Sequence, residues 1–293
     1  MALDFSGTGV ALVTPFHNNG SVDFDALDRI VNHTLEGGVE YLVVLGTTGE
    51  PATLGENEKK DVVSAVKKSI RNRVPLIIGI GGCNTAEVIE TIHSTNLDGI
   101  SAILSISPYY NKPSQKGLYE HFSAIAKSSP LPLIIYNVPG RTATNISAET
   151  TIKIAKDQKN IIAVKEASGN LTQIMQILKD KPPHFQVISG DDALTLPMIY
   201  LGAIGIISVI ANSHPRQYSD MVRAALTRDF KKANALHYKL LDYIGALFEE
   251  GSPSGVKAAL EIMGICKNTV RLPLVSASDS LKEKIDKLMK EIA

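Results

Sequence analysis

Short apolar runs recur along the first 210 residues, each followed by a polar or Gly/Pro-containing turn and then by a stretch with helical spacing of apolar positions. The runs are rich in Val, Ile and Leu and are apolar on both faces, which is typical of parallel strands covered by helices. They predict eight strands, at residues 10–13, 41–45, 76–80, 102–106, 133–136, 161–165, 187–189 and 206–209.

The stretches between many of these runs have the spacing of amphipathic helices, at residues 24–35, 56–70, 85–94, 115–126 and 148–155. Eight strand–helix units in about 230 residues fit a (β/α)8 barrel, whereas an open doubly wound sheet more often has about five to seven strands. The pattern therefore predicts an α/β protein with a TIM barrel.

The pattern changes after residue 209, where no further strand-like run occurs. Helical spacing continues at residues 217–226, 229–248, 255–263 and 281–292. The first of these helices would complete the barrel, and the others would form a C-terminal helical extension. We expect a catalytic barrel at residues 1–226 and a helical region at residues 227–293 packed on it, because no low-complexity linker separates them.

Composition narrows the class of partner. The 293 residues are 44% hydrophobic, and 30 Lys plus Arg balance 30 Asp plus Glu. A net charge of zero provides no basic field for nucleic acid and no polybasic segment for an anionic membrane surface. We therefore expect neither a nucleic-acid nor a membrane partner, but a small molecule or a second copy of the chain.

The two cysteines, Cys83 and Cys266, form no CxxC motif, and the seven histidines show no HxH or HxxxH spacing. The sequence therefore predicts neither a disulfide framework nor a metal site. The first nine residues lack the basic and apolar segments of a secretory signal, and no apolar run reaches the ~18 residues of a membrane span. We expect a cytoplasmic location.

Polar residues follow several of the predicted strands, and barrel active sites form at the carboxyl ends of the strands. These segments are GTTGE at 46–50, PYYN at 108–111, YNVPGRT at 136–142, KE at 165–166 and GDD at 190–192. Asp191 and Asp192 follow the seventh strand, where a barrel usually holds phosphate, and their charge indicates a substrate without phosphate.

Lys165 carries the clearest chemical signal, because it ends an apolar strand and so points to the mouth or the interior of the barrel. Burial disfavours the ammonium form, and the neutral amine is the form that attacks a ketone to give a Schiff base. A structural ion pair with Glu166 or another acid at the strand end is the alternative interpretation.

Hydroxyl groups gather at the same end of the barrel. Tyr136 ends the strand before Lys165, so its phenol could exchange a proton with a molecule bound to the lysine, or it could simply fill the top of the barrel. Thr47, Thr48 and Tyr110 add hydroxyls that could move protons, although each residue type is also common in caps and turns.

Two features could bind a carboxylate. The glycines around Thr47 and Thr48 allow close approach to backbone amides, although GTTGE could equally be a tight turn. Arg141, behind a Pro-Gly turn, could clamp a second carboxylate with two hydrogen bonds or could form a surface salt bridge.

Six separated segments together resemble the dihydrodipicolinate synthase family of pyruvate-dependent class I aldolases, whose superfamily includes N-acetylneuraminate lyase. They are GTTGE, PYYNKP, YNVPGRT, VKEASGN, SGDD and GIISV, and they span most of the chain in order. The resemblance implies that Lys165 forms a Schiff base with pyruvate, which attacks L-aspartate 4-semialdehyde and cyclises to 4-hydroxy-tetrahydrodipicolinate. This is the first committed step of the diaminopimelate and lysine pathway, and it needs no cofactor beyond the Schiff base.

The resemblance also implies roles in proton transfer and assembly. Tyr136 would be the proton donor and acceptor, in a relay with Thr47 and with Tyr110 from a neighbouring subunit. The protein would accordingly be a homotetramer built as a dimer of dimers.

The resemblance likewise implies how the two substrates are bound. Thr48 and the backbone of Ile207 would hold the carboxylate of pyruvate, and Arg141 would orient the carboxylate of the semialdehyde. Residues near Gly190 would line the same pocket. A sugar-acid lyase of the same superfamily is the alternative, but Arg141 favours a short acidic aldehyde over a polyhydroxylated chain.

Inhibition by L-lysine is common in this family at a dimer interface, and here the chain departs from the sensitive pattern. Pro51 stands after GTTGE, Glu56 and Lys59 replace histidines, and the usual asparagine is lost near Cys83 or shifted to Asn84. Glu87 and Tyr109 remain. The sequence leaves lysine regulation open, and activity measured against added lysine decides it.

Overall fold

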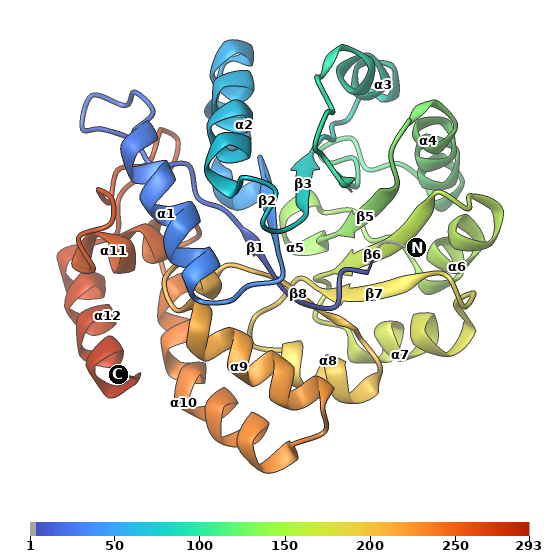
Figure 1. The fold of residues 1–293 in the computed structure, drawn as a ribbon. Coiled ribbons are helices and arrows are strands. Elements are labelled where there is room, and N and C mark those ends of the chain that lie inside the picture. The colour runs from blue at the N-terminus through green and yellow to red at the C-terminus, as the bar shows by residue number, and fades with distance from the viewer. Residues whose placement is uncertain (1–3, 293) are drawn as a thin grey trace.

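Eight parallel strands pair in chain order, and the eighth pairs with the first, so that the sheet closes into a barrel (Figure 1). This computed structural model describes residues 4–292. It confirms the predicted TIM barrel. The strands are β1 Gly7–Ala11, β2 Tyr41–Val44, β3 Leu76–Gly79, β4 Ala102–Ile106, β5 Leu133–Asn137, β6 Ile161–Glu166, β7 Gln186–Ser189 and β8 Gly205–Ser208.

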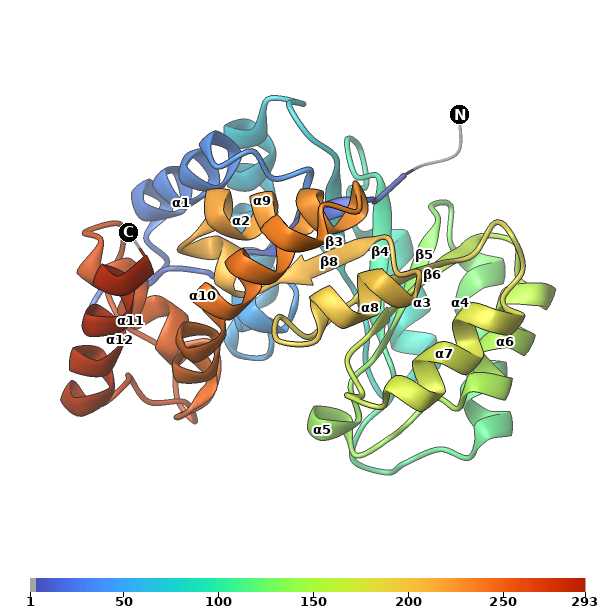
Figure 2. The ribbon, with the colours of Figure 1, turned by 90° about the horizontal axis from the view of Figure 1, so that it is seen from below.

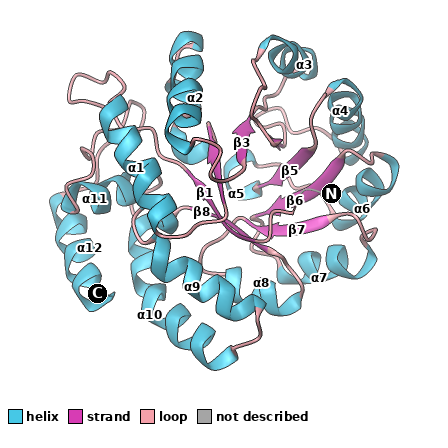
Figure 3. Cartoon of the chain, in the orientation of Figure 1, coloured by secondary structure: helices cyan, strands magenta, loops and turns pink. Residues whose placement is uncertain are grey.

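Helices surround the strands on the outside of the barrel (Figure 3). Helices from the barrel part of the chain are α1 Phe24–Glu36, α2 Glu56–Ile70, α3 Thr85–Ser94, α4 Gln115–Ser128, α5 Pro139–Thr142, α6 Ala148–Asp157, α7 Leu171–Asp180, α8 Thr195–Leu201 and α9 Pro215–Leu226. The remaining helices are α10 Phe230–Phe248, α11 Ser254–Ile262 and α12 Asp279–Ile292. Among the described residues, no helix is long and apolar enough to cross a membrane.

The first strand differs from the predicted one. It begins at Gly7 and ends at Ala11, whereas the apolar run predicted residues 10–13. Backbone pairing decides this boundary, because Gly7 pairs with Gly205 and Gly9 with Tyr41 although neither glycine contributes apolar surface. The sequence pattern also did not predict α5, α7 and α8.

Side chains alternate between two cores, as they must along a strand. One set fills the barrel and includes Val43, Leu104, Ile134 and Ala163. The other set, which includes Val44, lies between the strands and the surrounding helices. Both faces of each strand are therefore buried, which explains the continuous apolar runs in the sequence.

Glycine lets the first and the last strand approach each other closely. A Cβ atom at Gly205 would lie only 2.0 Å from the backbone oxygen of Gly7. At the amino end of the barrel, Phe5 packs edge-to-face on Tyr41, whose hydroxyl donates to the backbone oxygen of Ile206 at 3.0 Å. Aromatic side chains thus close the amino end of the barrel. The active site can therefore form only at its carboxyl end.

Short polar side chains start many of the helices. A side-chain oxygen just before the helix accepts a hydrogen bond from a backbone N–H of the first turn, which stabilises the helix start. This cap is made at α1, α3, α4, α6, α7 and α10 by Asp23, Asn84, Ser114, Ser147, Asn170 and Asp229 respectively.

The helices after residue 226 pack beside the barrel and lie next to α1 and α9 in Figure 1. Helix α10 packs on α9, and α11 and α12 pack on α10. Figure 2, turned by 90°, shows these helices on the same side of the molecule. The division at residues 226 and 227 stays a prediction, and its outer ends at residues 1 and 293 lie outside the described residues.

Two buried histidines predict a loss of stability in mild acid. Burial lowers the pKa of both His121 and His214 to about 4. The unfolded chain, with histidine pKa values near 6.5, therefore binds more protons than the fold between pH 6.5 and 4, and the free energy of unfolding falls as the pH falls through this window. Each histidine costs about 2 kcal/mol at pH 5 relative to pH 7.

Asp192 acts in the opposite direction, because burial raises its pKa to about 6 and the fold then binds the extra proton. Asp192 therefore raises the free energy of unfolding by about 1 kcal/mol at pH 5 relative to pH 7. Urea unfolding followed by circular dichroism should show a lower midpoint at pH 5 than at pH 7. The variant His121→Gln should lose much of this difference, and the exposed control His184→Gln should keep it. An unchanged midpoint in the wild type would contradict the prediction.

Candidate active site

Lys165 and Tyr136 face each other inside the carboxyl end of the barrel. They are direct partners in the pairing of β5 with β6, and the Lys165 Nζ atom lies 4.2 Å from the centroid of the Tyr136 ring. Lys165 is 5% and Tyr136 is 6% exposed. No ion pair joins Lys165 to a carboxylate within residues 4–292, so the ion-pair interpretation with Glu166 is wrong.

Glu166 instead points to the outside of the barrel, as the next residue along a strand must. Its carboxylate accepts hydrogen bonds from Asn137 Nδ2 at 3.0 and 3.2 Å, from the Ser168 N–H at 2.7 Å and from Gln173 Nε2 at 3.2 Å. Burial raises the pKa of Glu166, and these hydrogen bonds oppose the shift. The network ties the ends of β5 and β6 together directly behind Tyr136 and Lys165.

The turn after β2 brings Thr47 and Thr48 to the same end of the barrel. Residues Thr47–Gly49 form one turn of 3₁₀ helix, in which Gly49 N–H donates to the Gly46 backbone oxygen at 2.9 Å. The Thr14 hydroxyl fastens this turn to the chain after β1, because it donates to the Gly49 backbone oxygen at 2.7 Å. Thr48 is buried and Thr47 is half-buried.

Ile207 lies in β8 with its side chain inside the barrel. Asp192 supports the backbone around it, because the Asp192 carboxylate accepts from the Ser208 hydroxyl at 2.6 Å and from the Val209 N–H at 3.0 Å. The carboxylate is fully buried, so these bonds hold the ends of β7 and β8 together. Neither Asp191 nor Asp192 has a partner of opposite charge among the ion pairs of the described residues.

Gly190 makes room for the lysine. A Cβ atom at this position would lie 2.9 Å from Cε and 3.1 Å from Cγ of Lys165, and 2.8 Å from Cβ of Ala167. These distances are below ordinary van der Waals contact. Gly190 directly follows β7, the strand that pairs with β6, and it therefore belongs to the surroundings of Lys165.

Arg141 lies in the short helix α5, which stands at the carboxyl end of the barrel in Figure 2. Its side chain is exposed and lines the same cleft as Tyr136 and Thr47. No carboxylate of residues 4–292 forms a salt bridge with it. The alternative interpretation of Arg141 as one half of a surface salt bridge is therefore wrong for the single chain.

Tyr110 stands apart from the other site residues. It is 90% exposed and has a backbone φ of 70°, in the left-handed region that few non-glycine residues adopt. No hydrogen bond joins the side chains of Thr47, Tyr136 and Tyr110 within residues 4–292. A single chain thus brings together Lys165 and Tyr136 but does not complete the relay that the sequence predicts.

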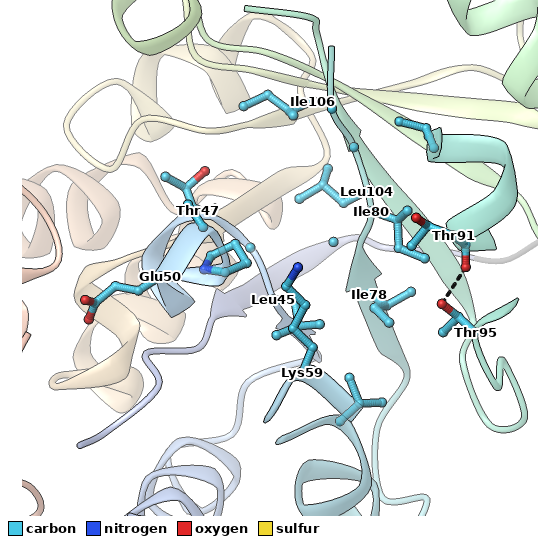
Figure 4. Close-up of a pocket in the computed structure, with 18 of the residues that line it drawn as sticks. Leu45, Thr47, Glu50, Lys59, Ile78, Ile80, Thr91, Thr95, Leu104 and Ile106 are labelled. Atoms are coloured by element: carbon cyan, nitrogen blue, oxygen red, sulfur yellow. Dashed lines mark hydrogen bonds between the residues drawn. The ribbon is translucent and has the colours of Figure 1, made fainter. Parts of the chain in front are cut away.

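A cleft of about 1030 Å³ opens at these strand ends and extends between α2 and α3 (Figure 4). Thr47, Tyr136 and Arg141 line one part of it. The other part contains Lys59, which forms an ion pair with Glu56 at 2.7 Å. Among the described residues, no group of three or more His, Cys, Asp or Glu side chains could hold a metal ion.

Sequence reasoning missed the supporting residues of the site. The sequence pattern indicates Glu166 only as an ion-pair partner of Lys165, and Asp192 only as a charge that repels phosphate. The alternation of side chains along β6 could have placed Glu166 outside the barrel, because Lys165 points inside. Glu50, the last residue of GTTGE, is buried at 4% exposure, and the sequence pattern indicates no role for it.

The closed barrel, with a buried lysine and tyrosine at the carboxyl ends of its strands, fits an aldolase-type lyase, the class to which its named relatives belong. The chain belongs to the dihydrodipicolinate synthetase family, whose model matches residues 4–292. The resemblance seen in the sequence is thereby confirmed.

Similar proteins cover the whole chain. A 4-hydroxy-tetrahydrodipicolinate synthase of Flavobacterium psychrophilum is 52% identical over 289 residues, which are 99% of each chain. The crystal structure of dihydrodipicolinate synthase from Aquifex aeolicus is similar with a TM-score of 0.94 and 41% identity, over 98% of each chain. A chloride-inhibited dihydrodipicolinate synthase from Acinetobacter baumannii, solved in complex with pyruvate, gives a TM-score of 0.95 at 36% identity and 99% coverage of each chain.

Proposed function

We propose that this protein condenses pyruvate with L-aspartate 4-semialdehyde to give 4-hydroxy-tetrahydrodipicolinate. The observation that carries the proposal is the buried amine of Lys165, which lies 4.2 Å from the Tyr136 ring without an acidic partner in the described chain, in a family whose relatives bear the corresponding name. The amine attacks the keto carbon of pyruvate, and loss of water gives the Schiff base. Loss of a methyl proton gives the enamine, whose carbon attacks the aldehyde. The amino group of the semialdehyde then attacks the imine carbon, which closes the ring and releases Lys165 as the free amine.

Binding of the two carboxylates orients the reaction. Thr48, in the turn after β2, and the backbone of Ile207, in β8, bind the carboxylate of pyruvate. Arg141 at the rim binds the carboxylate of the semialdehyde, for which its exposed guanidinium offers a planar pair of donors. Gly190 keeps the space that the lysine needs.

Proton transfer involves Tyr136, Thr47 and a tyrosine from a second chain. Tyr136 donates and accepts the protons at the Schiff base, and Thr47 and Tyr110 connect it to solvent. The exposure of Tyr110 supports its insertion into the site of a neighbouring subunit. We accordingly propose a homotetramer built as a dimer of dimers, which acts in the cytoplasm and needs no metal or cofactor besides the covalent Schiff base.

Reduction with borohydride in the presence of pyruvate tests the central step. Mass spectrometry of the digested protein should find the reduced adduct on Lys165. Absence of any adduct under native conditions would remove the Schiff base from the mechanism. The alternative function on a sugar acid is not favoured by the names of the relatives. Turnover of N-acetylneuraminate above that of the semialdehyde would reinstate it.

A methyl group at Gly190 should disturb the lysine without changing the chemistry. We expect Gly190→Ala to lower turnover about 100-fold, because a displacement of the amine by about 1 Å spoils its alignment with the keto carbon. Initial rates and the rate of borohydride trapping measure the effect. The control is Gly245→Ala in α10, where the added Cβ atom has no neighbour within 4 Å. This variant should keep full activity. Turnover within twofold of wild type for Gly190→Ala would show that Lys165 adapts to the methyl group.

A further inference from the structure

A buried ion pair joins the turn after β2 to the C-terminal helices. Lys257 in α11 places its ammonium 2.5 Å from Oε1 of Glu50, the last residue of GTTGE. The exposed fractions of the two side chains are 0% and 1%. The pair connects positions 207 residues apart in the chain.

Both charged groups have further partners of the C-terminal region. The other carboxylate oxygen of Glu50 accepts from the Arg271 N–H at 3.0 Å, and Lys257 Nζ donates to the Thr269 backbone oxygen at 2.8 Å. The ammonium also lies 4.2 Å from the centroid of the Phe16 ring. Burial lowers the pKa of Lys257, and the adjacent Glu50 carboxylate opposes this shift. A buried pair with these partners has few other arrangements available, so it fixes geometry more than it adds stability.

The backbone of Glu50 carries this constraint into the turn. Its φ of 53° lies in the left-handed region, which a side chain other than glycine adopts only at a cost. Its N–H donates to the Thr47 backbone oxygen at 3.1 Å, and its own backbone oxygen accepts from the Thr53 N–H at 3.0 Å. The position of the carboxylate thus determines the path of the backbone that carries Thr47 and Thr48.

Glu50 lines the same cleft as Thr47, and Figure 4 shows its carboxylate pointing away from other labelled side chains such as Lys59. Although Glu50 borders this cleft, its carboxylate is bound by Lys257 and by the Arg271 N–H, so we expect it to act on the substrates through the turn. Lys257 is fully buried in α11 and is not among the residues that line the cleft.

We propose that Glu50 and Lys257 form a positioning pair that holds the Thr47–Thr48 turn in the shape that binds the carboxylate of pyruvate. The C-terminal helical region thereby helps to hold the turn that carries Thr47 and Thr48. The inference rests on the proposed function, because it requires that this turn binds pyruvate.

Three variants test the pair. Glu50→Gln removes one charge with little change of shape, and Lys257→Met removes the other. The double variant has no unpaired buried charge, so it remains folded even where the single variants unfold. We expect the pyruvate concentration that half-saturates borohydride trapping to rise at least about tenfold in the double variant, at a temperature well below its unfolding transition. Saturating pyruvate should still modify Lys165.

The control is Glu261→Gln, which breaks the 2.8 Å ion pair between α11 and Lys282 of α12. Glu261 has no contact with the turn, so half-saturation should stay at the wild-type value. A wild-type value in the double variant, or an equal rise in the control, would overturn the positioning role. Failure of the wild-type protein to form any adduct would instead overturn the proposed function.

Discussion

Lys165→Ala should lower turnover by at least about 10⁴-fold, because the side chain supplies the nucleophile through which the proposed reaction proceeds. The variant should also lose the mass increment of the reduced pyruvate adduct. Its fold should persist, since alanine is compatible with the strand and, within residues 4–292, the lysine makes no ion pair that would leave a buried carboxylate unpaired. Steady-state rates and mass spectrometry after borohydride reduction measure both effects.

The control for this variant is a lysine at the other end of the barrel. Lys181 precedes β7 and donates to the Phe185 backbone oxygen at 2.7 Å, away from the carboxyl ends of the strands. Lys181→Ala should keep both the turnover and the adduct. If Lys165→Ala still forms a pyruvate adduct at another lysine with turnover near that of wild type, the assignment of the nucleophile is wrong.

Tyr110→Phe should lower turnover about 100-fold and leave the adduct on Lys165, because it removes a hydroxyl from the proton relay and keeps the aromatic ring. Tyr238 in α10 offers a control, since it is 70% exposed and far along the chain from the site residues. Tyr238→Phe should be fully active. Equal turnover of Tyr110→Phe and wild type would exclude the relay.

Mixing two inactive variants tests whether Tyr110 acts in the neighbouring chain. A dimer of one Lys165→Ala and one Tyr110→Phe subunit contains one complete site, formed by Lys165 of the second chain and Tyr110 of the first. Subunits mixed at random after dissociation should therefore recover about a quarter of the wild-type activity per chain. If the mixture is no more active than its components, Tyr110 serves its own chain or no chain.

The barrel could be predicted because its strands are buried on both faces and so appear as continuous apolar runs. The first strand begins three residues earlier than the apolar run predicts, because Gly7, Thr8 and Gly9 pair through the backbone and provide no apolar pattern. Helix α8 has only seven residues, too few to show helical spacing. Helix α7 could have been found, because Leu171, Ile174 and Ile177 have that spacing.

The site was predictable where strand order alone brings residues together. Tyr136 and Lys165 end consecutive strands, and consecutive strands of a barrel are neighbours. Contacts across long stretches of sequence were not predictable in this way. The pairing of Glu50 with Lys257 depends on how α11 packs on the barrel, and no local pattern contains that information. The roles of all the site residues stay predictions, those of Lys165, Tyr136, Thr47 and Tyr110 as well as those of Thr48, Ile207, Arg141 and Gly190.

The contact between Gly7 and Gly205 has a consequence for biosynthesis. The two strands that close the ring are separated by almost the whole barrel, so a chain growing on the ribosome exposes the unpaired edge of β1 until the segment of β8 has emerged. An unpaired edge is a template for aggregation, and glycine adds no side chain that could shield it. We therefore expect chaperones to matter more for the yield of this protein than for that of a helical bundle of equal length.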